Sequence, residues 1–138
     1  MSSTIDQIRA AIAAIEAGKP DDEVNRLCAL AFGWEIRTNQ WTNDFFVSRK
    51  EPRGEEIWCD CPFYTTSLDA IMAEMPDGWL CTSNIEIGSG HVVWRAMIWK
   101  LEYGVRLNQF GHCARAGTEE RARLKALLRA MGAQADAS

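Results

Sequence analysis

The segment from His91 to Leu101 limits the possible folds more than any other part of the sequence. Apolar residues occupy both sets of alternating positions in it, Val92, Trp94, Ala96 and Ile98 in one set and Val93, Met97, Trp99 and Leu101 in the other. Successive side chains of a β-strand point to opposite faces, so this strand is apolar on both faces. The pattern therefore predicts a central strand of a sheet with other elements covering both faces.

Extended structure is also predicted on either side of this segment. Before it, apolar side chains alternate along a predicted strand, at Trp79, Cys81, Ile85 and Ile87. The glycines of Gly88-Ser89-Gly90 predict a short hairpin turn between the two strands. After it, a further extended segment opens at Gly104 and carries Val105, Leu107 and Phe110.

The residues from Trp34 to Phe63 form short runs that are rich in aromatic and β-branched residues. We expect two strands there, Trp41–Val47 and Ile57–Cys61. The charged stretch Ser48–Glu56 between them contains Pro and Gly, so it predicts a hairpin tip that is exposed to solvent.

Four helices are predicted from the spacing of apolar residues. They run from about Ser3 to Ala17, from Asp21 to Gly33, from a cap at Thr66 or Ser67 to Pro76, and from Thr118 to Gly132. In the last three, the apolar positions span two turns, which is typical of a helix resting on a flat surface. The chain thus mixes helices and strands.

Length, charge and composition exclude several classes of protein. The 138 residues are enough for one domain with one core, and the apolar and charged fractions are those of a soluble globular chain. The net charge of -4 comes without an acidic block and mildly disfavours nonspecific nucleic-acid binding, because the phosphate backbone attracts clustered Lys and Arg. Met1–Asp6 carries no basic leader, and no segment approaches the ~20 apolar residues of a membrane helix. We expect a cytoplasmic protein with no membrane partner and with reduced cysteines.

Short local motifs resemble the phage ABA sandwich domain, a small family of bacteriophage and prophage proteins. The likeness covers roughly residues 24 to 132 and is carried by four motifs: Ala31-Phe32-Gly33-Trp34, Pro62-Phe63-Tyr64-Thr65-Thr66-Ser67-Leu68-Asp69-Ala70-Ile71, Pro76-Asp77-Gly78-Trp79 and Ala114-Arg115-Ala116-Gly117-Thr118. The resemblance implies an α/β/α layered domain encoded by a phage or a prophage. It implies no catalytic residues, because the family has no established activity.

With this resemblance, the expected fold class is α+β: a single-domain α/β/α layered sandwich with a mainly antiparallel, twisted sheet of about four to six strands and about four helices. The domain is expected over residues 1–132. Residues 1–20 form an extra N-terminal helix that the family pattern does not require, residues 24–132 form the ABA-sandwich-like region, and residues 133–138 form a frayed tail.

Few residues point to chemistry. Cys59, Cys61, His112 and Cys113 provide the four ligands that a structural zinc needs, but their spacing does not match the common zinc motifs, and buried thiols explain them as well. A pairing of Cys113 or Cys81 with His91 would give a thiol nucleophile, but no third group orients it. We therefore expect no cofactor, no metal and no enzymatic activity.

Six tryptophans are more than a core of this size needs. Trp41 and Trp58 flank the charged tip, which carries Arg49, Lys50 and Arg53. Paired aromatic residues near such cations can stack on a base or on a partner's side chains. A cross-strand aromatic pair that steadies the hairpin is the simpler explanation. These five residues are the predicted contact with a partner or ligand.

The function we expect is that of a non-enzymatic accessory protein of a phage or prophage that binds a host or phage protein, for example as an inhibitor of host defence. The alternative is a small-ligand or nucleotide-binding module of the sponge type, using exposed tryptophans. Self-association is a further expectation, because the first helix or an uncovered sheet face could bury apolar side chains across a two-fold axis.

Overall fold

A computed structural model describes residues 4–51, 53–88, 90–102 and 105–137. These residues form four helices and two three-stranded antiparallel sheets, which confirms the mixed α+β class. In chain order the elements are α1 (Thr4–Glu16), α2 (Asp21–Ala31), β1 (Glu35–Thr38), β2 (Phe45–Lys50), β3 (Glu56–Cys59), α3 (Leu68–Ala73), β4 (Trp79–Gly88), β5 (His91–Glu102), β6 (Val105–Ala116) and α4 (Glu119–Ala137).

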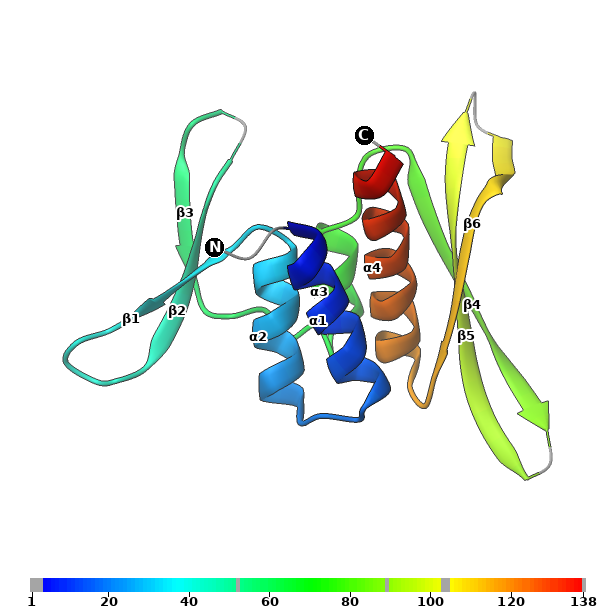
Figure 1. The fold of residues 1–138 in the computed structure, drawn as a ribbon, viewed down its shortest axis with the longest axis horizontal. Coiled ribbons are helices and arrows are strands. Elements are labelled where there is room, and N and C mark those ends of the chain that lie inside the picture. The colour runs from blue at the N-terminus through cyan, green and yellow to red at the C-terminus, as the bar shows by residue number, and fades with distance from the viewer. Residues whose placement is uncertain (1–3, 52, 89, 103–104, 138) are drawn as a thin grey trace.

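The two sheets lie on opposite sides of the helices. Sheet A has the order β1-β2-β3 and sheet B the order β4-β5-β6, and Figure 1 shows the helices between them. We expected a single sheet of about four to six strands. The described strands instead divide into two sheets, because the connection from β3 to β4 passes through α3 rather than through a hairpin.

Strand β5 occupies the centre of sheet B, as its apolar sequence predicts. Ile98 pairs with Cys81 of β4 and with His112 of β6. Helix α4 packs on the face that carries the buried Ala96 and Ile98. The expected cover on both faces is not found, because no helix or second sheet of the described chain lies on the opposite face of sheet B (Figure 1).

The opposite face of sheet B is partly shielded by its own side chains. Val93, Met97 and Trp99 of β5 point to this face and are half-buried there. The Trp99 Nε1 donates a 2.8 Å hydrogen bond to Thr82 Oγ1 on the neighbouring strand. Neighbouring large side chains on one sheet face remove part of their apolar area from water even without a covering layer.

Helices α1 and α4 pack closely where a glycine stands in α4. A Cβ added at Gly132 would lie 3.4 Å from the Cγ2 atom of Ile8, which is itself only 2 % exposed. Helix α4 continues through Gly132 to Ala137, although the glycine and the expected frayed tail predicted an end there. The contact with α1 explains the glycine, and the apolar stripe of α1 is covered by α2 and α4.

Sheet A contains one strand more than the sequence predicts. Strand β1 was missed because only Ile36 of its four residues is partly buried, so the alternation is too weak to recognise. Strand β2 runs on to Lys50 and β3 begins at Glu56, so the tip between them is shorter than expected.

The cap of α3 provides a local test of the fold. Ser67 has an extended backbone and its Oγ accepts a hydrogen bond from the Ala70 backbone N–H at 3.2 Å. Ser67→Ala should lower the free energy of unfolding by about 1 kcal/mol, because the first turn loses this acceptor. Thr66→Ala is the matched control and should change it by less than about 0.5 kcal/mol. Chemical denaturation measures both, and equal losses would argue against the cap.

Among the described residues, no helix is both long enough and apolar enough to cross a membrane.

Candidate binding surface

The outer face of sheet A is the candidate binding surface. Strand β2 pairs with both neighbours, with Phe46 opposite Arg37 and Ser48 opposite Trp58. The alternate residues Ile36 and Val47 point inward, where Val47 is completely buried. The side chains of the outer face are therefore those of Glu35, Arg37, Phe46, Ser48, Lys50, Glu56 and Trp58.

An aromatic pair lies at the centre of this face. The rings of Phe46 and Trp58 are stacked, with centroids 5.3 Å apart and an angle of 25° between their planes. The guanidinium of Arg37 lies 5.9 Å from the centroid of the Trp58 ring. Trp58 nevertheless keeps 55 % of its surface exposed. A large ring that is held in place and still exposed is the type of residue that anchors interfaces.

A polar groove lies beside the aromatic pair. It has a volume of about 490 Å³, and its lining residues are Gly33, Glu35, Arg37, Ser48, Arg49, Lys50 and Glu56. Arg37 spans it, since its Nε donates to Ser48 Oγ at 3.3 Å and its Nη2 lies 2.9 Å from Glu35 Oε2. The surface thus has an aromatic centre and a rim with charges of both signs.

Below the groove, a buried carboxylate ties sheet A to the helices. Glu74, the residue that ends α3, accepts three hydrogen bonds and has a side chain only 8 % exposed. Its Oε1 accepts from Arg49 Nη1 at 2.7 Å. Its Oε2 accepts from Trp34 Nε1 at 2.8 Å and from Tyr64 Oη at 2.6 Å. We call these four residues the Glu74 cluster; it joins β2, α3 and the segments next to β1 and α3.

The charge of Arg49 is stabilised inside this cluster. Burial acts to lower its pKa, but the hydrogen bond and the negative charge of Glu74 outweigh burial and hold the pKa above its ordinary value. The guanidinium also lies 4.0 Å from the centroid of the Trp34 ring. Burial, and then the charge of Glu74, raise the pKa of Tyr64, so its hydroxyl stays protonated and donates.

The five predicted contact residues do not form one cluster in the structure. Lys50 is an exposed residue at the end of β2, and Trp58 lies on the same face. Arg49 lies at the groove but is engaged by Glu74, and Arg53 is exposed in the tip. Trp41, which is 94 % exposed, lies in the β1–β2 loop at the opposite end of β2 from the charged tip. The prediction that these residues contact a partner stays a prediction.

Five residues of this face were not singled out from the sequence: Glu35, Arg37, Phe46, Ser48 and Glu56. The aromatic partner of Trp58 is Phe46, not Trp41, and the cation above its ring is Arg37. Recognising β1 as a strand would have placed Arg37 beside Phe46, because the two are directly opposite in the register.

The four candidate zinc ligands lie in two distant regions. Cys59 ends β3 and Cys61 follows it, whereas His112 and Cys113 are on β6, at the other end of the molecule (Figure 1). Within the described residues, no group of three or more His, Cys, Asp or Glu side chains is arranged to hold a metal ion.

The candidate Cys-His pairs are also separated. Cys81 and Cys113 pair with Ile98 and Met97, which are six or seven residues along β5 from His91. At the rise of a strand this is about 20 Å. Cys113 instead accepts a 3.1 Å hydrogen bond from Arg95 Nε.

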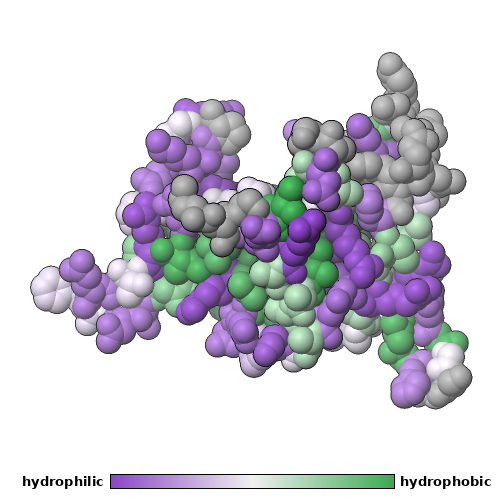
Figure 2. All heavy atoms as spheres, viewed as in Figure 1, coloured by the Kyte–Doolittle hydropathy of each residue, from purple (hydrophilic) through white to green (hydrophobic). Residues whose placement is uncertain are grey.

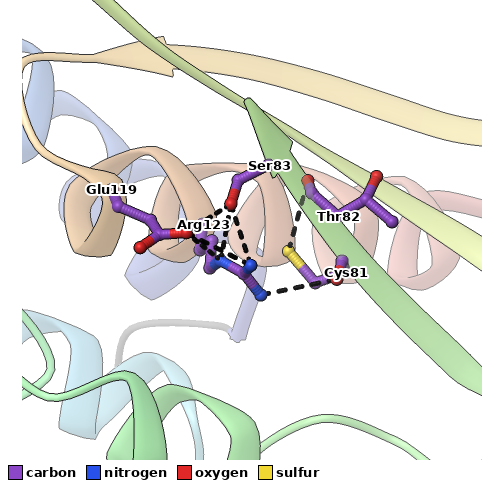
Figure 3. Close-up of polar contacts among 5 residues, drawn as sticks. All are labelled: Cys81, Thr82, Ser83, Glu119 and Arg123. Carbon is purple, nitrogen blue, oxygen red and sulfur yellow. Dashed lines mark hydrogen bonds and ion pairs between the residues drawn. The ribbon is translucent and has the colours of Figure 1, made fainter. Parts of the chain in front are cut away.

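A polar cluster joins α4 to sheet B (Figure 3). Ser83 Oγ donates to Glu119 Oε2 at 2.5 Å and accepts from Arg123 Nη2 at 2.8 Å. Arg123 also donates to the backbone oxygen of Cys81 at 3.4 Å. These side chains use their hydrogen-bonding capacity on one another, so the cluster fixes the start of α4 on β4.

Comparisons with protein-family models, with curated proteins and with solved structures found no match to this chain.

Proposed function

We propose that this protein is a non-enzymatic binding protein and that its partner, a host or phage protein, contacts the outer face of sheet A. The observation that carries the proposal is the exposed Trp58, held by Phe46 and Arg37 beside the polar groove. Partner interfaces are built around large, ordered aromatic anchors with a polar rim, and this face has both.

The assignment to a phage or prophage, to the ABA sandwich family and to the host cytoplasm rests on the sequence resemblance. A role in blocking host defence is one form of such an accessory function.

Capture from a bacterial lysate with wild-type and variant protein tests the binding surface. Trp58→Ala should weaken capture of the partner at least about tenfold, since an anchoring aromatic side chain contributes more than about 1.4 kcal/mol. The fold should persist, because the ring is half exposed.

Trp41→Ala is the matched control, since it is the same substitution in an exposed loop away from the groove. Capture that survives Trp58→Ala but is lost with Trp41→Ala would move the site to the β1–β2 loop.

Small-ligand or nucleotide binding is the second candidate, favoured by the three cations that line the groove, Arg37, Arg49 and Lys50. A base stacked on Trp58 would quench its fluorescence, and Trp58→Phe would remove the response. Titration with nucleotides that leaves the fluorescence unchanged would rule against this candidate in favour of a protein partner.

A further inference from the structure

Strand β4 is a long, open edge of sheet B. Its ten residues pair with β5 without a bulge, from Trp79 opposite Lys100 to Gly88 opposite His91. Natural edge strands are protected by Lys, Pro, bulges or shortness. Strand β4 has none of these, and its one charged residue is Glu86. Within the described residues, no strand pairs with the outer side of β4.

The backbone groups at this edge can be assigned from the register. Leu101 N–H donates to Gly78 O at 2.6 Å, and hydrogen-bonded pairs alternate along an antiparallel ladder. The odd-numbered residues of β4 therefore point their N–H and C=O groups outward. Two of these groups are already used, since Trp79 N–H donates to Pro76 O and Cys81 O accepts from Arg123. The open part of the edge consists of Ser83, Ile85 and Ile87.

The same part of β4 carries exposed apolar side chains. Ile85, Ile87 and the neighbouring Val92 are 49 %, 83 % and 58 % exposed. They lie on the same face of sheet B that α4 covers further along the strands. The β4–β5 hairpin extends beyond the end of β6, where the last pair is Trp94 with Ala116. Figure 2 shows hydrophobic atoms at this projecting end of the hairpin, at the lower right. Backbone and side chains at this end both lack cover.

We propose that β4 of a second copy of this chain pairs antiparallel with this edge, about a two-fold axis at Ile85. In this register Ile85 faces Ile85 of the second copy, and Ile87 faces Ser83. Three hydrogen-bonded pairs then add about six main-chain hydrogen bonds. Sheet B of one copy and sheet B of the other then form one continuous six-stranded sheet.

The sequence of β4 suits a second copy better than an unrelated strand. Glu86 faces the neutral Asn84 of the other chain, so no like charges meet across the axis. A two-fold axis perpendicular to the sheet keeps both copies of α4 on one face. The apolar side chains at the ends of the two β4–β5 hairpins then pack against one another between the two copies of α4, which removes them from water. This surface is distinct from the outer face of sheet A, so the dimer does not depend on the proposed function.

Sedimentation velocity of the full chain over a wide concentration range tests the dimer. We expect a reversible monomer–dimer equilibrium for the wild type. Ile85→Lys places two ammonium groups opposite each other at the axis and should make the protein monomeric at every concentration. Trp41→Lys, the same kind of change at an exposed apolar residue of the β1–β2 loop, should leave the equilibrium unchanged. If circular dichroism shows that Ile85→Lys does not fold, Ile87→Lys replaces it, since Ile87 is more exposed.

Crosslinking tests the register. The Cα atoms of a hydrogen-bonded antiparallel pair are about 5.5 Å apart, which suits a disulfide. Ile85→Cys should therefore form an interchain disulfide under mild oxidation much faster than wild type or Trp41→Cys. A wild type that is monomeric throughout, a dimer that survives Ile85→Lys, or equal crosslinking of the two cysteine variants would overturn the proposal. So would a monomer whose β4 binds only an extended segment of another protein.

Discussion

Replacing Glu74 with alanine should lower the free energy of unfolding by about 3–5 kcal/mol, because one partner of a buried ion pair is removed and the other is left uncompensated. Glu74 accepts hydrogen bonds from Arg49, Trp34 and Tyr64. Arg49 would keep the weaker contact with Glu51 at 3.6 Å, the bond to Phe32 O and the contact with the Trp34 ring, but no strong ion pair.

The loss of stability in Glu74→Ala should be concentrated in sheet A. Hydrogen exchange should increase in β2 and β3 more than in α1 or α4, because the Glu74 cluster joins sheet A to the helices while the helices retain their own core. Chemical denaturation gives the total effect and hydrogen exchange its distribution.

Two variants control this experiment. Glu56→Ala removes an exposed carboxylate 3.8 Å from Arg37 in the same sheet and should cost less than about 0.5 kcal/mol. Glu74→Gln keeps an acceptor oxygen but removes the charge. Its decrease in the free energy of unfolding should lie between those of Glu56→Ala and Glu74→Ala. A Glu74→Ala variant as stable as Glu56→Ala would show that the cluster does not join the sheet to the helices.

The second large effect is a loss of stability at alkaline pH. Burial raises the pKa of the Cys28 thiol from its ordinary value of 9.0 to about 12, with a smaller contribution from nearby Cys61. Above pH 9 the unfolded chain releases this proton and the folded chain keeps it, so stability that is present below pH 9 falls as the pH rises. The loss from this thiol is about 1.4 kcal/mol at pH 10 and approaches about 4 kcal/mol near pH 12.

Unfolding measured at pH 7 and at pH 10 for each variant isolates this contribution. Cys28→Ala costs stability at both pH values by leaving a cavity, but the difference between them should shrink by about 1.4 kcal/mol. The comparison stops at pH 10 because the raised pKa of Tyr64 adds its own loss above that pH. Cys59→Ala, at an exposed thiol, is the control and should keep most of the alkaline loss. If the free energy of unfolding of Cys28→Ala changed between pH 7 and pH 10 as much as that of the wild type, the alkaline loss would not come from Cys28.

Features that depend on neighbouring residues were predictable from the sequence. Ser67 and Thr118 accept hydrogen bonds from the first turns of α3 and α4, as their positions predict. The central place of β5 also followed from its composition. These features depend on short-range spacing, capping and alternation, which the chain carries locally.

The candidate surface was only partly predictable. Trp58 and Lys50 were identified because they stand near a charged turn. Phe46 and Arg37 were not, because their role depends on a strand pairing between residues that are distant in the sequence. Glu74 looked like an ordinary residue at a helix end, and its three donors come from positions 10 to 40 residues away.

The segment that most limits the fold, His91 to Leu101, shows which features the sequence determined and which only the tertiary structure decided. Its alternating apolar residues determined that it would be a strand with a strand on each side, because side-chain direction follows from backbone geometry alone. Only the tertiary structure decided that α4 would cover one face, that the strands would divide into two sheets, and that the edge of β4 would stay open. Those outcomes depend on which distant surfaces meet and how much apolar area each contact buries, and local spacing does not contain that information.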